Sequence, residues 1–285
     1  MIDMHVHPMH IAELWEEDPG LGRAVDGPFG LHGKPTPLES FLFQLEYCGV
    51  DHAVLLPLDC TASHGCVIVR NEALARLVAD QPRLIGFASV DPNQSDAAKR
   101  LRDAVEDLGL RGLKLDPSLQ GFDIDDEEAA YPVYAACVEL GVPLVMHCGL
   151  SWAPEGRSSR AHPLRLEPVV HQFPDLRVVI AHCGYPWVDD ALLLALKYEH
   201  VYLDTAIIYA GTPVDSLRRV FGERIGVDIV DRALHHKLVF GSNYPRVEIK
   251  RMVGAVRALG FHEWLEERVF HHNAADLLGL TGARS

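Results

Sequence analysis

The chain has 285 residues, of which 48% are hydrophobic and 23% charged, as in an ordinary soluble globular protein. Its 26 basic and 40 acidic side chains give a formal charge of −14, which argues against a nucleic-acid or anionic-membrane partner. A small anionic substrate is not excluded, because a few local arginines suffice to bind one.

Neither a signal segment nor a membrane span is expected. The first apolar strand begins at residue 2, and no apolar run reaches the roughly 18 residues of a membrane helix. The six cysteines form no C-x-x-C pair, so we expect reduced thiols in a cytoplasmic protein. Cys60 and Cys66 flank His64, but this spacing matches no common structural zinc site.

A stretch rich in glycine and proline, residues 8–37, follows the first strand. We expect a long inserted loop with one short helix near residues 11–17. Loops of this length in compact domains are usually functional lids or disordered. A helix should then run through Cys48, with Thr36 as its N-cap and Gly49 ending it.

From residue 52 onward, strands and helices alternate to the end of the chain. The expected strands lie at 52–57, 84–90, 111–115, 143–147, 177–182, 201–205 and 237–241. The expected helices lie at 70–80, 94–108, 127–140, 164–173, 187–198, 213–233, 247–258 and 262–279. The strands are nearly continuous apolar runs, as in parallel strands covered on both faces.

Together with the first strand, this alternation predicts a fold of the α/β class, a closed (β/α)8 TIM barrel. A doubly wound open sheet is the alternative, but it calls for a Gly-rich phosphate turn that the chain lacks. No break in composition marks a linker, so we expect residues 1–285 to form one domain.

Histidines recur at the C-terminal ends of the expected strands, where the active site of such a barrel lies. His5 and His7 are two apart on the first strand and should point the same way. His147 and His182 end the fifth and sixth strands. Four imidazoles at three strand ends indicate a metal site, whereas the other histidines fall in helices or loops and are read as surface residues.

Other polar residues end the remaining strands. Lys114 and Asp116 follow the fourth strand, Asp204 the seventh and Asn243 the eighth. A helix cap or a turn carboxylate is the preferred interpretation of the two aspartates. Alternation places Asp3 on the side of the two strand 1 histidines, either supporting one of them or as a buried, satisfied carboxylate.

Arginines and one tryptophan lie in loops that should cover the site. Trp152, Arg157 and Arg160 follow the fifth strand, and Arg246 follows the eighth. Arginines above a cationic centre are good clamps for a substrate carboxylate, so we assign these residues and Lys114 to substrate binding. The alternative for each arginine is a solvent-facing loop charge.

The order of motifs resembles the amidohydrolase superfamily. The motifs are D-x-H-x-H, G-L-K-L-D-P, M-H-C-G, I-A-H-C-G, F-G-S-N-Y-P and the closing N-A-A-D-L-L-G. More specifically, the chain is similar to the amidohydrolase-related branch that includes aminocarboxymuconate-semialdehyde and resorcylate-type decarboxylases. The likeness extends over the whole chain.

The resemblance implies one divalent metal ion, usually zinc, bound by His5, His7 and His147. It implies that His182 is the acid/base beside a metal-activated water, whose pKa the metal lowers toward about 7. In binuclear members a strand 4 lysine is carboxylated and bridges two metals. Because this branch is typically mononuclear, we read Lys114 as a pocket charge or a structural residue.

The chain departs from the family at strand 8, where Asn243 stands in place of the usual aspartate ligand. This leaves three alternatives. Three histidines hold the metal and Asn243 supplies a hydrogen bond, or the carboxylate of Asp204 or Asp116 replaces the missing ligand. In the third, the site holds metal poorly, as in metal-free lactonase relatives. Asn243 is kept with His182 as a catalytic candidate.

The sequence thus predicts a metal-dependent hydrolase of a small carboxylate-bearing ester, lactone or amide. A non-oxidative decarboxylase using the same site is the alternative, and a metal-free lactonase or an inert binding barrel is the third. We expect a small-molecule substrate and no nucleic-acid or membrane partner. The sequence leaves open whether the chain forms a homo-oligomer.

Overall fold

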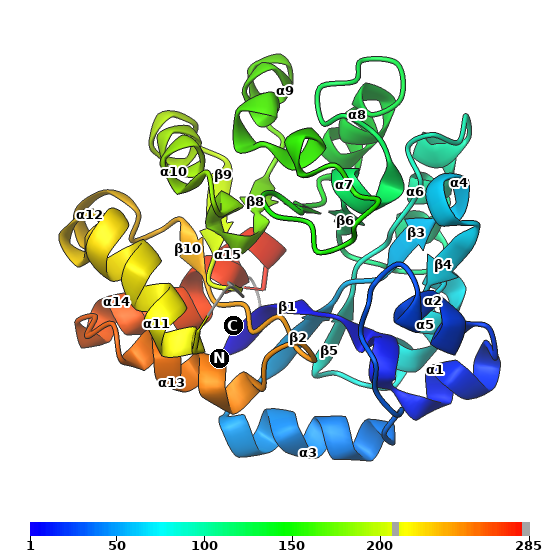
Figure 1. Cartoon of the computed structure of the whole chain (residues 1–285), viewed down its shortest axis with the longest axis horizontal. Helices are drawn as coiled ribbons and strands as arrows, with labels where there is room; N and C mark the ends of the chain where they lie inside the picture. Colours follow the sequence, from blue (N-terminus) through cyan, green and yellow to red (C-terminus); the bar gives the residue numbers. More distant parts are fainter. Residues whose placement is uncertain (207–210, 281–285) are drawn as a thin grey trace.

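The computed structural model describes residues 1–206 and 211–280. Within this part, eight parallel strands form the centre and helices surround them (Figure 1). The strands are β1 (Ile2–Val6), β2 (His52–Leu55), β5 (Leu84–Gly86), β6 (Leu113–Leu115), β7 (Leu144–Met146), β8 (Val178–Ile180), β9 (Val201–Asp204) and β10 (Leu238–Val239).

Backbone hydrogen bonds join these strands into a ring. The strand orders are β1-β2-β5 and β10-β9-β8-β7-β6, so two seams remain between the two groups. At one seam the Lys114 amide donates to the Ala88 carbonyl (2.8 Å), and at the other the His7 amide donates to the Tyr244 carbonyl (2.8 Å). The predicted TIM barrel is therefore confirmed.

Helices cover the outside of the ring. The main ones are α3 (Leu38–Cys48), α5 (Asn71–Ala79), α6 (Ala97–Glu106), α8 (Tyr131–Leu140), α9 (Leu166–Gln172), α10 (Val188–Lys197), α11 (Pro213–Leu217), the π-helical η5 (Arg218–Arg224), α12 (Val227–Ala233), α13 (Ile249–Arg257), α14 (Glu263–Glu267), the π-helical η6 (Arg268–His272) and α15 (Asn273–Leu278). No helix in the described ranges has the length and apolar character of a membrane span.

The insertion after β1 contains more helix than the sequence predicts. It forms η1 (Pro8–His10), α1 (Ala12–Glu17) and α2 (Leu21–Asp26). Helix α1 is the expected short helix, whereas α2 was not expected. The buried side chains of Leu21 and Val25 hold α2 to the core, which offsets the nearby helix-breaking glycines.

Several short strands and helices between the main elements were not predicted from the sequence. They are β3 (Leu58–Cys60), α4 (Thr61–His64), β4 (Cys66–Ile68), α7 (Pro117–Gln120), η2 (Ser158–Ala161), η3 (Pro163–Arg165) and η4 (Ala181–Gly184). Strands β3 and β4 form an antiparallel hairpin after β2. Segments of three or four residues are too short to show a hydrophobic period.

The cap of α3 differs from the expected one. The helix begins at Leu38, and Thr36 does not cap it. The Glu13 carboxylate of α1 instead accepts hydrogen bonds from the Leu38 amide at 2.9 and 3.0 Å. This cap comes from a distant segment, so a local sequence pattern does not reveal it. Gly49 ends the helix at φ 71°, as predicted.

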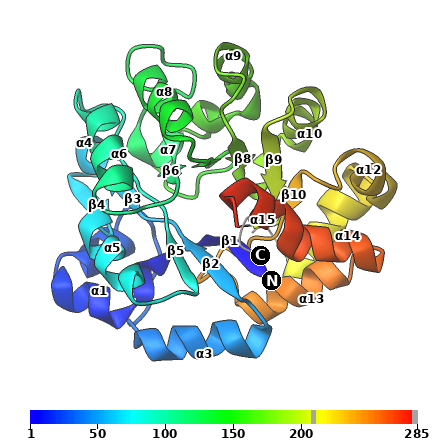
Figure 2. The same cartoon turned by 180° about the vertical axis from the view of Figure 1, so that it is seen from behind.

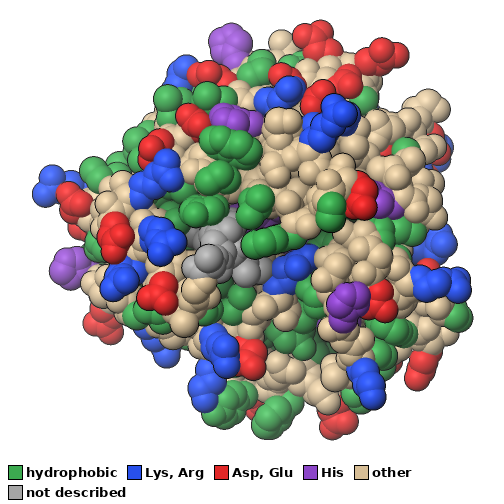
Figure 3. All heavy atoms as spheres, viewed as in Figure 1, with side chains coloured by type: hydrophobic (Ala, Val, Ile, Leu, Met, Phe, Trp, Pro, Cys, Tyr) green, Lys and Arg blue, Asp and Glu red, His purple; other side chains and the backbone are tan. Residues whose placement is uncertain are grey.

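The lower part of the barrel interior is apolar. Val54, Ile85, Val145 and Val179 belong to one buried cluster there, which Leu277 of α15 joins. Figure 2 shows α15 on the face of the molecule opposite to that of Figure 1. Figure 3 shows acidic and basic side chains interspersed around the rim of the face seen in Figure 1.

A β-bulge in β1 changes the side-chain alternation that the sequence predicts. Asp3 pairs with Ala53 and Val6 with Leu55, so β1 has one residue more than β2 between these pairs. Ala53, Val6 and Leu55 pack in the outer layer against the helices, and Asp3 therefore faces outward. The expectation that Asp3 shares a side with His5 is wrong, because the extra residue shifts the alternation.

Candidate metal centre

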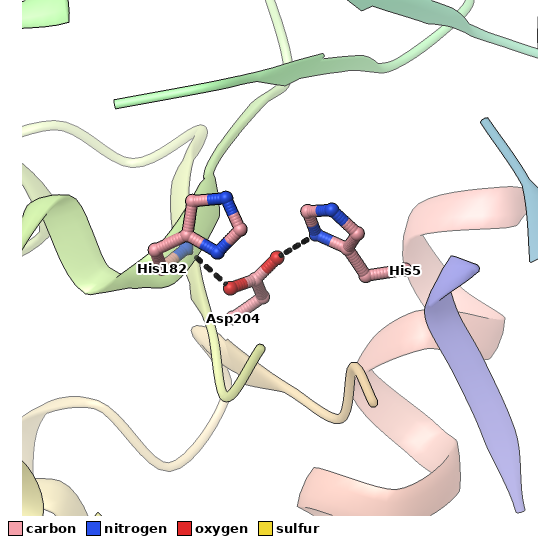
Figure 4. A group of neighbouring side chains, drawn as sticks. All are labelled: His5, His182 and Asp204. Carbon is pink, nitrogen blue, oxygen red and sulfur yellow. Dashed lines mark hydrogen bonds and ion pairs between the residues drawn. The ribbon is translucent and has the colours of Figure 1, made fainter. Parts of the chain in front are cut away.

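His5 points from β1 into the upper part of the barrel. Its Nδ1 lies 2.7 Å from Asp204 Oδ2 (Figure 4). Asp204 Oδ1 accepts hydrogen bonds from the His182 amide (2.6 Å) and the Ala206 amide (3.1 Å). Because a carboxylate only accepts, the His5 proton is assigned to Nδ1, and Nε2 is left as a bare lone pair.

His7 has the same tautomer. Its Nδ1 lies 3.2 Å from the Leu56 carbonyl oxygen, which also only accepts, so Nε2 is again bare. The Nε2 atoms of His5 and His7 lie 3.3 Å apart. Two nitrogens bound to one tetrahedral zinc at about 2.0–2.1 Å are separated by roughly 3.3 Å. The facing lone pairs repel each other unless a cation lies between them.

His147 supplies a third bare nitrogen. His182 Nδ1 lies 2.6 Å from the Ala206 carbonyl oxygen, which assigns the proton to Nδ1 and makes Nε2 an acceptor. His147 Nδ1 lies 3.1 Å from that Nε2 and 3.6 Å from Asp116 Oδ2, so it carries the His147 proton. His147 Nε2 is buried and has no hydrogen-bond partner.

A second ligand set competes with these three histidines. His5, His182 and Asp204 also offer ligand atoms that lie within 4.8 Å of one another. However, both Asp204 oxygens and His182 Nδ1 are already in hydrogen bonds. We therefore place Asp204 behind His5, where a carboxylate fixes the tautomer of a ligating imidazole.

Asn243 lies beside the same carbonyl group as His182. Its backbone adopts the left-handed conformation, with φ 61°, and its Nδ2 donates to the Ala206 oxygen at 3.2 Å. Asn243 Oδ1 is buried and has no hydrogen-bond partner. Three bare imidazole nitrogens near an unpartnered amide oxygen fit a divalent metal ion without a strand 8 carboxylate.

The electrostatic setting keeps the histidines neutral. Burial lowers the pKa of His5, His7 and His182 well below the ordinary value, and it lowers the pKa of His147 to about 3. Neutral imidazole is the form that binds metal. Burial also lowers the pKa of Lys114, although nearby carboxylates favour its ammonium form.

A cavity of about 50 Å³ opens above the histidines. Its walls are His7, Pro28, Phe29, Leu58, Lys114, Asp116, Leu119, His147, Leu150, Ser151, Trp152, Ala153, His182, Asn243 and Arg246. Arg246 Nη2 donates to the Phe29 carbonyl oxygen at 2.6 Å, and its guanidinium lies 4.6 Å from the Phe29 ring. The insertion after β1 thus forms part of the roof.

The structure brings together most of the residues that the sequence indicated, but not all. Arg157 is exposed and does not line this cavity. Arg160 does not line it either, because its guanidinium donates to the Gly121 carbonyl and lies 4.0 Å from Asp123. Phe29 was not predicted as a site residue, although an aromatic residue within a Gly- and Pro-rich stretch was a signal for it.

The two strand-end aspartates differ in role. Asp116 is the N-cap of α7, and its Oδ1 accepts a hydrogen bond from the Leu119 amide at 3.0 Å. This is the helix-cap interpretation that the sequence favoured. Asp204 caps no helix among the described residues and holds the His5 ring and the turn after β9.

With the geometry established, comparison with known proteins identifies the family. The sequence profile of the amidohydrolase family matches residues 2–280. The chain belongs to this family. Amidohydrolases are metal-dependent enzymes, and the histidine cluster at the top of this barrel agrees with that.

Individual relatives of this amidohydrolase include enzymes of several types. It is 25% identical to a 2-keto-4-carboxy-3-hexenedioate hydratase from Sphingobium over 66% of this chain and 59% of the hydratase. It is 28% identical to a 2-amino-3-carboxymuconate-6-semialdehyde decarboxylase from Dictyostelium discoideum over 27% of this chain and 22% of the decarboxylase. The chain thus matches less than two thirds of the length of either curated relative.

One solved structure is similar along its whole length. An uncharacterized TIM-barrel protein from Bordetella bronchiseptica has a TM-score of 0.77 and 23% sequence identity, with 99% of each chain covered. This likeness supports the barrel fold alone.

Proposed function

We propose that this amidohydrolase is a zinc-dependent hydrolase of a small carboxylate-bearing ester, lactone or amide. The observation that carries the proposal is the set of three bare Nε2 atoms on His5, His7 and His147, next to a fourth histidine with an accepting nitrogen. Three imidazoles suit zinc among the divalent ions. A bound zinc ion would lower the pKa of water and polarise a carbonyl oxygen.

His182 is the proton carrier in this proposal. The Ala206 carbonyl accepts from its Nδ1–H, which leaves Nε2 as the basic nitrogen of the ring. Nε2 accepts from His147 Nδ1–H (3.1 Å) and would exchange this contact for the water whose proton it takes and returns to the leaving group. Burial keeps the pKa of His182 low, which leaves this nitrogen unprotonated at neutral pH. Asp204 binds the His182 amide and thereby positions the ring.

The test is turnover of zinc-loaded protein on carboxylate-bearing lactones, esters and amides in ¹⁸O-labelled water. We expect incorporation of the label, and His182→Asn should lower kcat by about 10²–10⁴-fold with zinc retained. His171→Asn, at an exposed histidine of α9, is the matched control and should leave kcat unchanged. Full activity in a metal-free sample would contradict the proposal and favour the lactonase alternative.

Non-oxidative decarboxylation is the second candidate. Two cations in the cavity, Lys114 and Arg246, would hold a substrate carboxylate, and one relative is named as a decarboxylase. Release of CO₂ without incorporation of ¹⁸O would favour this reaction. Addition of water without a second product would instead favour a hydratase, as another relative is named.

A further inference from the structure

Two cationic side chains line the cavity without a carboxylate partner among the described residues. Lys114 is 2% exposed, and its Nζ has no hydrogen-bond partner. Arg246 is half-buried and donates to the Phe29 carbonyl, which carries no net charge. Burying an unpaired charge costs free energy unless a bound ligand supplies the opposite charge.

Asp116 favours the charged form of both cations and Asp204 that of Lys114, but no ion pair joins these carboxylates to the cations within the described residues. Asp116 caps α7 through Oδ1, and its Oδ2 faces His147 at 3.6 Å. Asp204 has both oxygens in hydrogen bonds to His5 and to backbone amides. Because neither carboxylate hydrogen-bonds to them, both cations can still bind a ligand carboxylate directly.

The two cations lie at different depths. Lys114 belongs to β6 and is only 2% exposed, whereas Arg246 is half-buried, so Lys114 lies deeper, at the floor of the cavity. Arg246 follows β10 and stacks on Phe29 of the insertion, which places it at the rim. The cavity also has apolar walls, among them Leu119.

We propose, building on the function proposed above, that the substrate is a dicarboxylate. One carboxylate binds the Lys114 ammonium at the floor, and the second binds the Arg246 guanidinium at the rim. The planar guanidinium suits two parallel hydrogen bonds to a carboxylate, whereas the ammonium acts as a point charge. A monocarboxylate leaves one of the two cations unpaired.

The experiment is calorimetric binding of straight-chain dicarboxylates, from malonate to adipate, and of monocarboxylates of equal length to the zinc-loaded protein. We expect one dicarboxylate to bind about tenfold or more tightly than its monocarboxylate, as one added charge-assisted contact gives. Arg246→Met and Lys114→Met should each abolish this preference. Arg160→Met, which removes an arginine outside the cavity, should keep it.

The outcomes separate this proposal from the proposed function. Equal affinities for both ligand classes in a protein that binds zinc and turns over would overturn the dicarboxylate assignment alone. A preference that survives Arg246→Met would overturn it as well. Absence of zinc from the purified protein would contradict the proposed function. The ligand preference would then still show whether the cavity binds one carboxylate or two.

Discussion

At the bottom of the barrel, β5, β7 and β8 point Ile85, Val145 and Val179 into an apolar cluster that α15 helps to cover. At the top, the chain leaving β7 and β8 carries His147 and His182 instead. The same strands thus build a dry core at one end and a cluster of buried polar groups at the other.

The difference shows where stability and chemistry reside. Apolar burial at the bottom stabilises the barrel, whereas the top holds buried atoms without partners, among them Lys114 Nζ, His147 Nε2 and Asn243 Oδ1. Such groups cost free energy in the folded protein, and they persist where ligands complete them. Substitutions at the two ends should therefore have opposite consequences.

The largest effect is expected for Phe87→Ala at the bottom. Phe87 is fully buried in the inner cluster, so its truncation should lower the free energy of unfolding by about 3–5 kcal/mol. Zinc content per folded chain should not change. Denaturant unfolding measures the loss, and Phe43→Ala, at a residue 67% exposed on α3, should stay within about 0.5 kcal/mol of wild type. Equal losses in both variants would contradict this contrast.

Lys114→Met at the top should have the opposite sign. Lys114 Nζ makes no hydrogen bond, so an apolar side chain of similar volume removes an unsatisfied buried donor and should raise the unfolding free energy of the metal-free protein by about 1–3 kcal/mol. Lys237→Met is the matched control, because that buried lysine donates to the Tyr198 and Glu199 carbonyls and its loss should destabilise. Destabilisation by Lys114→Met would mean that the ammonium is structural.

Asp204→Asn should weaken zinc binding by about 10–100-fold. An amide cannot both accept from the His182 amide and hold the His5 tautomer with Nε2 free, since one of its two atoms is a donor. Competition with a chelator measures the change. Asp59→Asn, at another buried carboxylate, is the control and should retain wild-type affinity. Unchanged zinc affinity in Asp204→Asn would show that Asp204 does not position a zinc ligand.

Asn243→Asp should have the smallest effect, a rise in zinc affinity of about tenfold at most. A carboxylate oxygen is the stronger ligand, but the variant loses the Nδ2 donor to the Ala206 carbonyl. The same chelator competition applies. Equal affinities would show that residue 243 does not face the ion.

The sequence predicted the barrel well, because apolar strands and amphipathic helices leave periodic signals. It also indicated the histidines, since strand ends meet on one axis of such a fold. It did not predict the bulge in β1, because one extra residue leaves no trace in the alternation. The Ala206 carbonyl, which fixes the His182 tautomer, is a backbone group and carries no signal in the residue type.

The placement of the arginines shows the same limit. Arg246 and Arg160 both lie in loops after strands, yet only Arg246 lines the cavity within the described residues. The difference comes from long-range partners, the Phe29 carbonyl for one and the Gly121 carbonyl for the other. A sequence pattern does not distinguish such partners.

The central claim is that His5, His7 and His147 hold the metal, with His182 beside it. Metal analysis of purified wild type, His147→Ala and His182→Asn tests this most directly. The account predicts about one zinc ion per chain in wild type and in His182→Asn, and its loss in His147→Ala. Zinc retained in His147→Ala and lost in His182→Asn would contradict the account and assign the ion to His5, His182 and Asp204.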